Sequence, residues 1–329
     1  METRDNQTGR PRIAILMAVY EPRPDWLREQ LRSLNEQSYS NLALYVRDDC
    51  SSPAAFELLQ TALRECITAF PYRLSRNESN CGSNQSFELL TQEAEGEFFA
   101  YCDQDDCWLP DKLQRYEQTL RERKSALLVC SDMYIMDQDG KTVAESMTAI
   151  RRHHRFHDGS GLAKELLFSN FVTGCAMMIR AEQAKAAIPF CPYMVHDHYL
   201  AFYSARLGEI AWIPEPLIRY RVHGGNQTRD MAGVVDKESY YRLRILMASN
   251  RLQWLWERFG GEEELRRLLD NGRRWVGARQ SYFRSGHGAG TIWKYRQFGK
   301  NTALFELAVP FLPTRIFMLI LDLKRRNYL

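Results

Sequence analysis

Three carboxylates stand within four residues directly after an apolar run. Asp103, Asp105 and Asp106 follow the segment 97–102, whose composition is that of a buried strand. Like charges this close repel one another unless a positive charge lies between them. A hard divalent cation with oxygen ligands, together with the phosphates that it carries, would supply that charge. The alternative is an acidic turn that caps a helix beginning at Pro110, and this segment alone leaves both interpretations open.

Three further residues, two aspartates and a histidine, could bind a ligand or transfer a proton. Asp49 follows a second apolar run, and Asp197 lies between two histidines in the segment 196–198. Either carboxylate could instead be a helix cap, a role that aspartate commonly plays. His223 stands in a polar segment, where it is either a ligand or a solvated imidazole.

Predicted strands and helices alternate over the first 131 residues, and this alternation must position the acids. The strands are at 12–19, 42–47, 72–75, 97–102 and 127–131, and the helices are at 25–37, with Asp25 as N-cap, 54–69, 84–93 and 110–124, with Pro110 in its first turn. Such alternation implies parallel strands with right-handed crossovers, covered by helices on both faces. Because ligands bind these sheets at the carboxyl ends of the strands, we expect both acidic groups to lie at one edge.

The second half of the chain is less regular. We expect helices at 161–168 and 198–207, strands at 172–180, 210–213 and 217–222, and a long helical region from Lys237 onward.

Composition excludes several classes of protein. With 329 residues, of which 45% are hydrophobic and 12% aromatic, the chain can bury a large core and is not disordered. None of its eight cysteines forms a C-x-x-C pair, which argues against a zinc site or a disulfide scaffold and fits a reducing compartment. Residues 1–12 are polar and charged, so we expect no secretory signal.

Basic residues concentrate in the last third of the chain. Residues 237–329 contain 18 Lys and Arg against 8 Asp and Glu, which indicates an anionic partner. Two apolar runs, 307–312 and 316–321, are much shorter than the ~20 residues of a membrane-spanning helix. An amphipathic helix on an anionic bilayer is one interpretation, and ordinary packing against the main domain with solvated arginines is the other. No nucleic-acid motif accompanies these charges.

Several motifs together resemble the inverting family 2 glycosyltransferases. The motifs of the nucleotide-sugar-binding half are IAILMAVY (13–20), REQLRSLNEQSYSN (28–41), RDDCSS (47–52), NESNCGSNQSFELL (77–90) and FFAYCDQDDCWLPDKL (98–113). Those of the acceptor half are FVTGCAMMIR (171–180), HDHYLAF (196–202) and IPEPLIRYRVHGGNQT (213–228). The motif at 98–113 is the most specific of them. The residues of these motifs are most similar to those of bacterial rhamnosyltransferase-like enzymes of surface-polysaccharide assembly.

The resemblance implies an A-type glycosyltransferase fold, an α/β architecture with a mostly parallel, Rossmann-like sheet flanked by helices, followed here by a helical C-terminal extension. It implies four parts: a flexible segment 1–11, a nucleotide-sugar-binding half 12–132, an acceptor-binding and catalytic half 133–230, and a basic amphipathic extension 231–329.

The resemblance also implies roles for individual residues. The implied nucleotide-sugar-binding residues are Ala18, Tyr20, Asp49, which would accept from the N3–H of uracil or thymine, Asn80, Gly82 and Asp103. Asp105 and His223 would hold Mg²⁺ or Mn²⁺, Trp108 would line the acceptor side, and Asp197 would be the catalytic base. Asp106 is expected to be a structural turn residue, and Asn84 to cap the helix that follows.

Two positions depart from the family pattern. Glu21-Pro22 stands where the family often has Asn after the loop tyrosine, and Cys50 stands where it often has Gly. Glycine adopts a positive φ angle more readily than cysteine does, so the donor loop is the part that these departures affect. A cationic cluster is expected to form a mobile, solvated loop near the acceptor, with phosphate or metal binding as the alternative: Arg151, Arg152, His153, His154, Arg155 and His157.

The implied activity is metal-dependent, inverting transfer of a sugar, with rhamnose as the leading candidate, from a UDP- or dTDP-sugar to a glycan hydroxyl. We expect a polyprenyl-diphosphate-linked acceptor, peripheral membrane contact through the C-terminal helices, no nucleic-acid partner, and a cytoplasmic location at the inner face of the plasma membrane. The alternative function is a catalytically silent, nucleotide-sugar-binding scaffold of a polysaccharide complex. A glycoside hydrolase and a nucleotidyltransferase are weaker alternatives.

Overall fold

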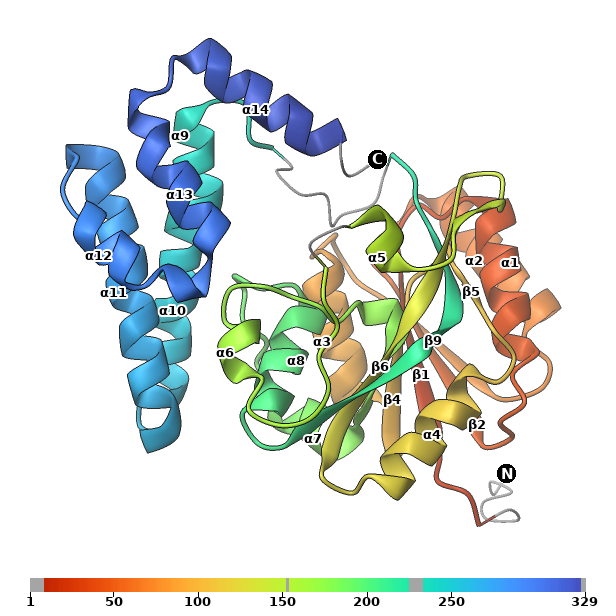
Figure 1. Ribbon diagram of the computed structural model, residues 1–329. Helices are drawn as coiled ribbons and strands as arrows, with labels where there is room; N and C mark the ends of the chain where they lie inside the picture. The colour runs from red at the N-terminus through yellow and green to blue at the C-terminus, as the bar shows by residue number, and fades with distance from the viewer. Residues whose placement is uncertain (1–8, 152–153, 225–232, 327–329) are drawn as a thin grey trace.

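The computed structural model describes residues 9–151, 154–224 and 233–326, and its centre is one mixed sheet (Figure 1). The strands lie in the order β3-β2-β1-β4-β8-β6-β9-β5, and β7 pairs with β6. Their bounds are β1 (Ile13–Val19), β2 (Leu42–Asp48), β3 (Tyr72–Arg76), β4 (Phe98–Cys102), β5 (Cys107–Trp108), β6 (Ala126–Met136), β7 (Thr142–Ala144), β8 (Met177–Arg180) and β9 (Glu209–Arg221).

The sheet is mostly parallel, as predicted, with antiparallel strands inserted from distant parts of the chain. β1 pairs in parallel with β2 and β4, and β2 with β3. β8 lies between β4 and β6 and is antiparallel to both, and β5 is antiparallel to β9. The alternation in the sequence therefore identifies the parallel strands but not the strands that separate or flank them.

The helices that accompany the sheet are α1 (Pro24–Asn35), α2 (Pro53–Cys66), α3 (Ser83–Glu93), α4 (Lys112–Glu122), α5 (Met147–Ile150), α6 (Ala163–Leu166), α7 (Ala181–Ala186) and α8 (His196–Ala205). Both faces of the sheet are covered, as predicted. Along β1, Ile13, Ile15 and Met17 pack with α1, α2 and α4, while Ala14 and Leu16 pack with α3 and α8. This division follows from the alternation of side chains along a strand.

Several predicted boundaries are wrong. α1 begins at Pro24 with Arg23 as its N-cap, not Asp25. α4 begins at Lys112 rather than Pro110, because the Lys112 N–H donates to the Leu109 carbonyl and closes a turn first. The predicted strands 210–213 and 217–222 are one strand, β9, whose prolines fall where its register with β6 shifts. The predicted strand from residue 172 begins only at Met177, because residues 174–176 form a 3₁₀ turn.

A helical extension follows the sheet and packs against it. Its helices are α9 (Lys237–Tyr240), α10 (Met247–Phe259), α11 (Glu263–Ser285), α12 (Ala289–Lys294), α13 (Lys300–Ala308) and α14 (Thr314–Arg326). Leu252 and Leu255 of α10 are fully buried in the same core cluster as α8. For α10, the interpretation as ordinary packing is therefore correct.

A buried ion pair holds the extension together. Arg279 of α11 donates two hydrogen bonds of 2.6 Å to the carboxylate of Glu306 in α13. The Tyr240 hydroxyl of α9 donates to the same carboxylate at 2.8 Å. Because an unpaired buried charge is strongly destabilising, these contacts fix how the three helices sit together.

The last helix, α14, is only half covered. Phe317 and Leu321 are fully buried against residues that include Val234 and Tyr240. Ile316, Leu319 and Leu323 are about half exposed, at 46%, 58% and 54%. Among the described residues, no helix combines the length and the apolar character needed to cross a bilayer.

Two sequence predictions fall mainly outside the described residues. They are the flexible segment 1–11, of which only residues 9–11 are described, and the boundary between residues 230 and 231.

Candidate active site

The predicted acids meet at the carboxyl edge of the sheet. Val19 at the end of β1 lies opposite Asp48 at the end of β2, and the Asp49 N–H donates to the Val19 carbonyl at 2.8 Å. β4 ends one residue before Asp103 and lies on the other side of β1. The turns after β1, β2 and β4 are therefore neighbours, as the parallel topology predicted.

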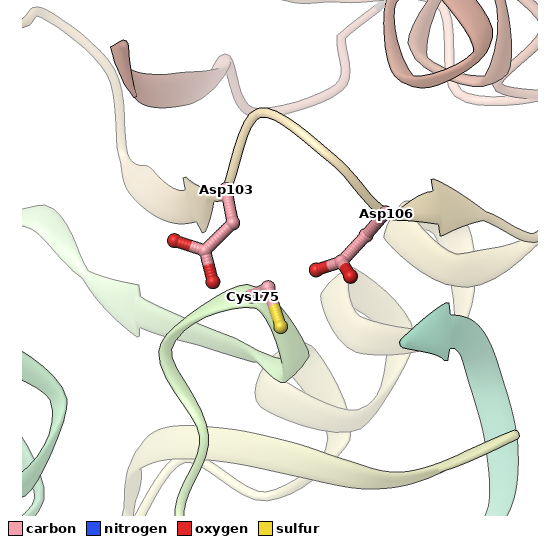
Figure 2. Close-up of side chains that lie close together, drawn as sticks. All are labelled: Asp103, Asp106 and Cys175. Atoms are coloured by element: carbon pink, nitrogen blue, oxygen red, sulfur yellow. The ribbon is translucent and has the colours of Figure 1, made fainter. Parts of the chain in front are cut away.

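The loop between β4 and β5 carries the densest group of carboxylates. Figure 2 shows the side chains of Asp103, Asp106 and Cys175 directed toward one another. One ligand-type atom from each lies within 4.8 Å of the others. Asp106 is fully buried, and its Oδ1 accepts from the Arg221 N–H at 2.9 Å. Its Oδ2 has no hydrogen-bond partner among the described residues.

Burial and mutual repulsion make these acids hard to ionise. Burial, with the charges of Asp105 and Asp197, raises the pKa of Asp103 to about 7. Burial and the charges of Asp105 and Asp103 hold the pKa of Asp106 well above its ordinary value. Burial likewise keeps the pKa of the Cys175 thiol high, so the sulfur is protonated and is a poor ligand for a hard cation.

Two cations approach this acidic loop from inside the protein. Lys112 is fully buried, and its ammonium donates to the Cys175 carbonyl. Burial lowers the pKa of Lys112 to about 7, although the acids nearby oppose the shift. Arg221 donates from Nε to the Asp105 carbonyl at 2.8 Å and forms a salt bridge with Glu29 of α1. Arg221 thereby ties β9 and α1 to the acidic loop.

Asp105 points away from the buried group and toward His223. Its Oδ2 lies 2.7 Å from His223 Nε2, and both side chains keep some exposure. With Asp103 alongside, these residues offer the carboxylate oxygens and imidazole nitrogen that Mg²⁺ and Mn²⁺ accept. The buried Asp106 oxygen without a partner and the crowded negative charge also fit a cation at this edge. The residues present therefore fit a divalent metal ion.

Both carboxylate oxygens of Asp49 accept hydrogen bonds from the protein itself. Its Oδ1 accepts from the Asn77 amide at 2.7 Å and from the Cys81 N–H at 2.9 Å. Its Oδ2 accepts from the Gly82 N–H at 2.8 Å. These hydrogen bonds lower the pKa of Asp49 and outweigh its burial. Asp49 therefore anchors the turn 77–82.

The other predicted donor-side residues lie around this turn and the end of β1. Gly82 has a φ of 84° and is the N-cap of α3, in keeping with a glycine there for backbone geometry. Asn84 is inside α3 and donates to the Cys191 carbonyl at 3.4 Å, so the predicted cap is wrong. Asn80 is exposed on the same turn, Ala18 is half-buried near the end of β1, and Tyr20 is 49% exposed just beyond it.

Asp197 lies in the first turn of α8 and is held by three donors. Asn170 donates to its Oδ1 at 3.1 Å, the Gly174 N–H donates to its Oδ2 at 2.9 Å, and its own neighbour His198 donates from the backbone. Burial raises the pKa of Asp197 to about 6 in spite of these bonds. Its charge also raises the pKa of Asp103, so the two carboxylates lie in one electrostatic environment.

The two histidines beside Asp197 serve the core. His198 Nε2 lies 2.6 Å from the Leu166 carbonyl. The His196 ring lies 4.0 Å from the Phe87 ring and 5.2 Å from the Tyr101 ring, centroid to centroid. Burial lowers the pKa of both histidines to about 3, so both are neutral.

Trp108 is buried against the side chain of Lys112. It is 3% exposed, and its ring lies 3.3 Å from the Lys112 ammonium. In this conformation the ring supports the buried cation and offers little surface to an acceptor.

The cationic cluster at 151–157 is not a fully solvated loop. Arg152 and His153 lie outside the described residues, but His154 is largely buried and burial lowers its pKa to about 4. Phe156 stacks on Trp212 with the ring centroids 5.3 Å apart. The expectation of a solvated loop is wrong for this part, because aromatic side chains pin it to β9.

Sequence reasoning missed several residues that shape the site. Lys112 and Gln104 stand inside the motif at 98–113, where only the acids and Trp108 received roles. Gly174 and Cys175 stand in the segment 171–180, and Arg221 follows it by about 40 positions along the chain. Their presence in motifs was a signal, but only the fold shows what they contact.

Comparisons with known proteins place the chain in a family. The family model for glycosyl transferase family 2 matches residues 14–183, just over half of the chain. A protein of Nostoc sp., described as an uncharacterised glycosyltransferase, is 24% identical over 239 residues, which cover 69% of this chain and 70% of that protein. TuaG of Bacillus subtilis is 25% identical over 175 residues, which cover 53% of this chain and 64% of TuaG. TuaG is described as a proposed glycosyltransferase of teichuronic acid biosynthesis.

Two solved structures share the fold. TarS 1–349 of S. aureus, in complex with UDP-GlcNAc, has a TM-score of 0.56 at 16% identity and covers 88% of this chain and 91% of that one. The mannosyltransferase PcManGT of Pyrobaculum calidifontis, in complex with GDP-Man and Mn²⁺, has a TM-score of 0.55 at 15% identity and covers 94% and 84%. At these identities the likeness concerns the fold, and it confirms the predicted fold class.

The packing of Gly174 gives a first testable prediction. A Cβ atom there would stand 2.7 Å from His196 Nε2 and 3.6 Å from Asp197 Cβ. Gly174→Ala should lower the free energy of unfolding by about 1–3 kcal/mol, as overpacked core substitutions do. The loss should shrink when His196→Ala removes the clashing ring. Equal losses in both backgrounds, measured by chemical denaturation, would contradict the packing. Gly277→Ala, where a Cβ meets nothing within 4 Å, is the control.

Proposed function

Since this chain belongs to glycosyl transferase family 2 and is a glycosyltransferase, we propose that it moves a sugar from a UDP- or dTDP-sugar to a glycan hydroxyl with inversion at the anomeric carbon. The observation that carries the proposal is the arrangement at the carboxyl edge of the sheet. There Asp105 Oδ2 lies 2.7 Å from His223 Nε2, and the charges of Asp105 and Asp197 both raise the pKa of Asp103. One edge thus holds a cation site and a candidate base.

The donor lies, in this proposal, across the ends of β1 and β2. Tyr20 and Ala18 line the nucleotide, and the turn 77–82, with Asn80 and Gly82, lies under the donor sugar. Asp49 keeps that turn in place, and a bond from a uracil or thymine N3–H would replace one of its present donors. Support comes from the neighbours of the same fold that were solved with UDP-GlcNAc and with GDP-Man.

The metal site consists of Asp105 and His223, with Asp103 facing the ribose or the metal shell. A bound Mg²⁺ or Mn²⁺ neutralises charge on a diphosphate leaving group. PcManGT, a neighbour of the same fold, was solved with Mn²⁺, which supports a divalent ion in this proposal. Arg221 holds the loop that presents Asp105 through its hydrogen bonds to the Asp105 carbonyl and to Asp106.

Asp197 is the general base in this proposal. It takes the proton of the attacking hydroxyl on a carboxylate oxygen, a contribution typically worth ~10²–10⁴-fold in rate. The Asn170 and Gly174 donors orient that carboxylate. With its pKa raised to about 6, Asp197 is mostly ionised at neutral pH and is a stronger base than an ordinary aspartate. Attack opposite the leaving group inverts the anomeric carbon and requires no covalent intermediate.

The acceptor in this proposal is a growing polysaccharide on a polyprenyl diphosphate at the inner face of the plasma membrane. Its support is the half-exposed apolar row Ile316, Leu319 and Leu323 on α14, next to the exposed Arg315. Figure 1 draws α14 at the same end of the molecule as the carboxyl ends of β6 and β9. Rhamnose is the donor sugar that we would test first, and the assignment of TuaG to teichuronic acid biosynthesis supports a role in the assembly of a polymer.

The central test measures nucleoside diphosphate release from UDP-, dTDP- and GDP-sugars with and without Mn²⁺ or Mg²⁺. We expect metal-dependent turnover of one donor. Asp197→Asn should lower the rate by ~10²-fold or more while metal-dependent nucleotide binding persists. Asp105→Ala should weaken that binding, and the exposed Asp139→Ala is the control.

Two outcomes would sink parts of this proposal. Equally tight, metal-dependent binding in Asp105→Ala would remove Asp105 from the metal site. Nucleotide binding without turnover on any donor or acceptor would favour the silent scaffold.

The pH profile gives a test that is specific to the base. Asn170 donates to the ionised form of Asp197, and such a bond lowers a carboxyl pKa. In Asn170→Ala that pKa should therefore rise. Because the base works only when deprotonated, the acidic limb of kcat/KM should move to higher pH. A limb that stays in place, with Asn170→Ala stably folded, would argue that another group controls it.

Membrane contact predicts binding of the full chain to vesicles of phosphatidylcholine with phosphatidylglycerol, and weaker binding to phosphatidylcholine alone. The variant Ile316→Asn/Leu319→Asn/Leu323→Asn should lose most of that binding, because it removes exposed apolar area and spares the buried Phe317 and Leu321. Val143→Asn, at another exposed apolar position, is the control. Dimers of the wild type in buffer that the triple variant abolishes, without vesicle binding by either, would instead assign the row to a second copy.

A further inference from the structure

Gln104 joins the acidic loop to the end of β1. The Tyr20 N–H donates to Gln104 Oε1 at 2.9 Å, and Gln104 Nε2 donates to the Tyr20 carbonyl at 3.1 Å. The side-chain amide thus pairs with the backbone of Tyr20 as a neighbouring strand would, across 84 residues of sequence. Gln104 stands between Asp103 and Asp105, so whatever moves that loop also moves the partner of Tyr20.

The residue after Tyr20 is held from the opposite side. Glu21 has a φ of 42°, a left-handed conformation that residues with side chains adopt rarely. Its N–H donates to Ser51 Oγ at 2.9 Å, and its carboxylate accepts from the Ser52 N–H at 2.6 Å. The turn 20–21 is therefore clamped between the acidic loop and the start of α2.

This clamp connects two halves of the proposed donor site. Asp105, one residue after Gln104, would hold the cation that meets the diphosphate, and the half-exposed Tyr20 would line the nucleotide. A side chain that fixes the spacing between these two groups pre-organises the site for a nucleotide diphosphate, which must reach both at once.

We propose that Gln104 is a positioning residue that sets the nucleotide-binding turn 20–21 relative to the metal-binding loop. This inference rests on the proposed function for the identity of the ligand. Among the described residues, the Gln104 side chain forms its hydrogen bonds with the backbone of Tyr20, on the nucleotide side of the proposed site, so its loss should weaken donor binding and spare the chemical step.

The test compares Gln104→Met, a side chain of similar length without an amide, with Gln118→Met on the exposed face of α4. In Gln104→Met, amide hydrogen exchange in residues 18–22 should accelerate about tenfold or more in the full chain without ligand. The KM for the donor should rise about tenfold, the size expected from two lost hydrogen bonds, with kcat within about threefold. Gln118→Met, whose amide contacts only Glu122 in α4 among the described residues, should change neither.

Each other outcome overturns the inference. Unchanged exchange would mean that Gln104 does not hold the turn. Faster exchange with an unchanged KM would make the clamp purely structural. A fall in kcat at constant KM would place Gln104 in the chemistry instead. If the wild type shows no turnover, the proposed function fails separately. The affinity for UDP and dTDP then replaces KM, and an unchanged affinity in Gln104→Met would overturn the inference.

Discussion

The concentration of negative charge at one edge of the sheet is the constraint on which the rest of the structure depends. Parallel strands end at one edge, so the acids that follow β2 and β4 are brought to that edge whether or not their charges favour it. Two cations lie close to these acids. The buried Lys112 ammonium donates to the Cys175 carbonyl, and Arg221 donates to the backbone carbonyl of Asp105 in the acidic loop. In spite of these cations, burial and mutual repulsion hold the pKa values of Asp103 and Asp106 above their ordinary values. A divalent cation at this edge would favour the ionised form of these carboxylates.

Two strands from the second half of the chain, β8 and β9, bring residues to this edge. β8 enters the sheet between β4 and β6, and the 3₁₀ turn just before it brings Cys175 to the acids and Gly174 to Asp197. β9 ends at Arg221, whose N–H holds Asp106. The contacts of Cys175 and Arg221 join the second half of the chain to the acidic loop of the first half, and the contact of Gly174 fixes Asp197 within the second half.

The two departures from the family pattern are accommodated by local contacts. Cys50 has a φ of 62°, as a glycine in its place would, and Glu21 has a φ of 42°. Left-handed backbone costs a residue with a side chain roughly 1–2 kcal/mol. Glu21 offsets that cost by accepting from both the N–H and the hydroxyl of Ser52. Side-chain hydrogen bonds with Ser51 and Ser52 thus hold the turn 20–21 in this conformation.

The sequence by itself determined the alternating strands and helices, the covered sheet and the placement of Asp49, Asp103 and Asp105 at one edge. Hydrophobic periodicity is a local property of the chain, and strict alternation of strands and helices implies parallel strands whose carboxyl ends share an edge. It could not determine that the carboxylate of Asp49 accepts hydrogen bonds from the turn 77–82, that the buried Trp108 ring packs against the Lys112 ammonium, or that Asp106 accepts a hydrogen bond from the Arg221 N–H. Only the tertiary structure decided these, since each is a contact between segments far apart in sequence. Hydrogen-bond partners and burial follow from the fold as a whole, and no residue carries them in its type alone.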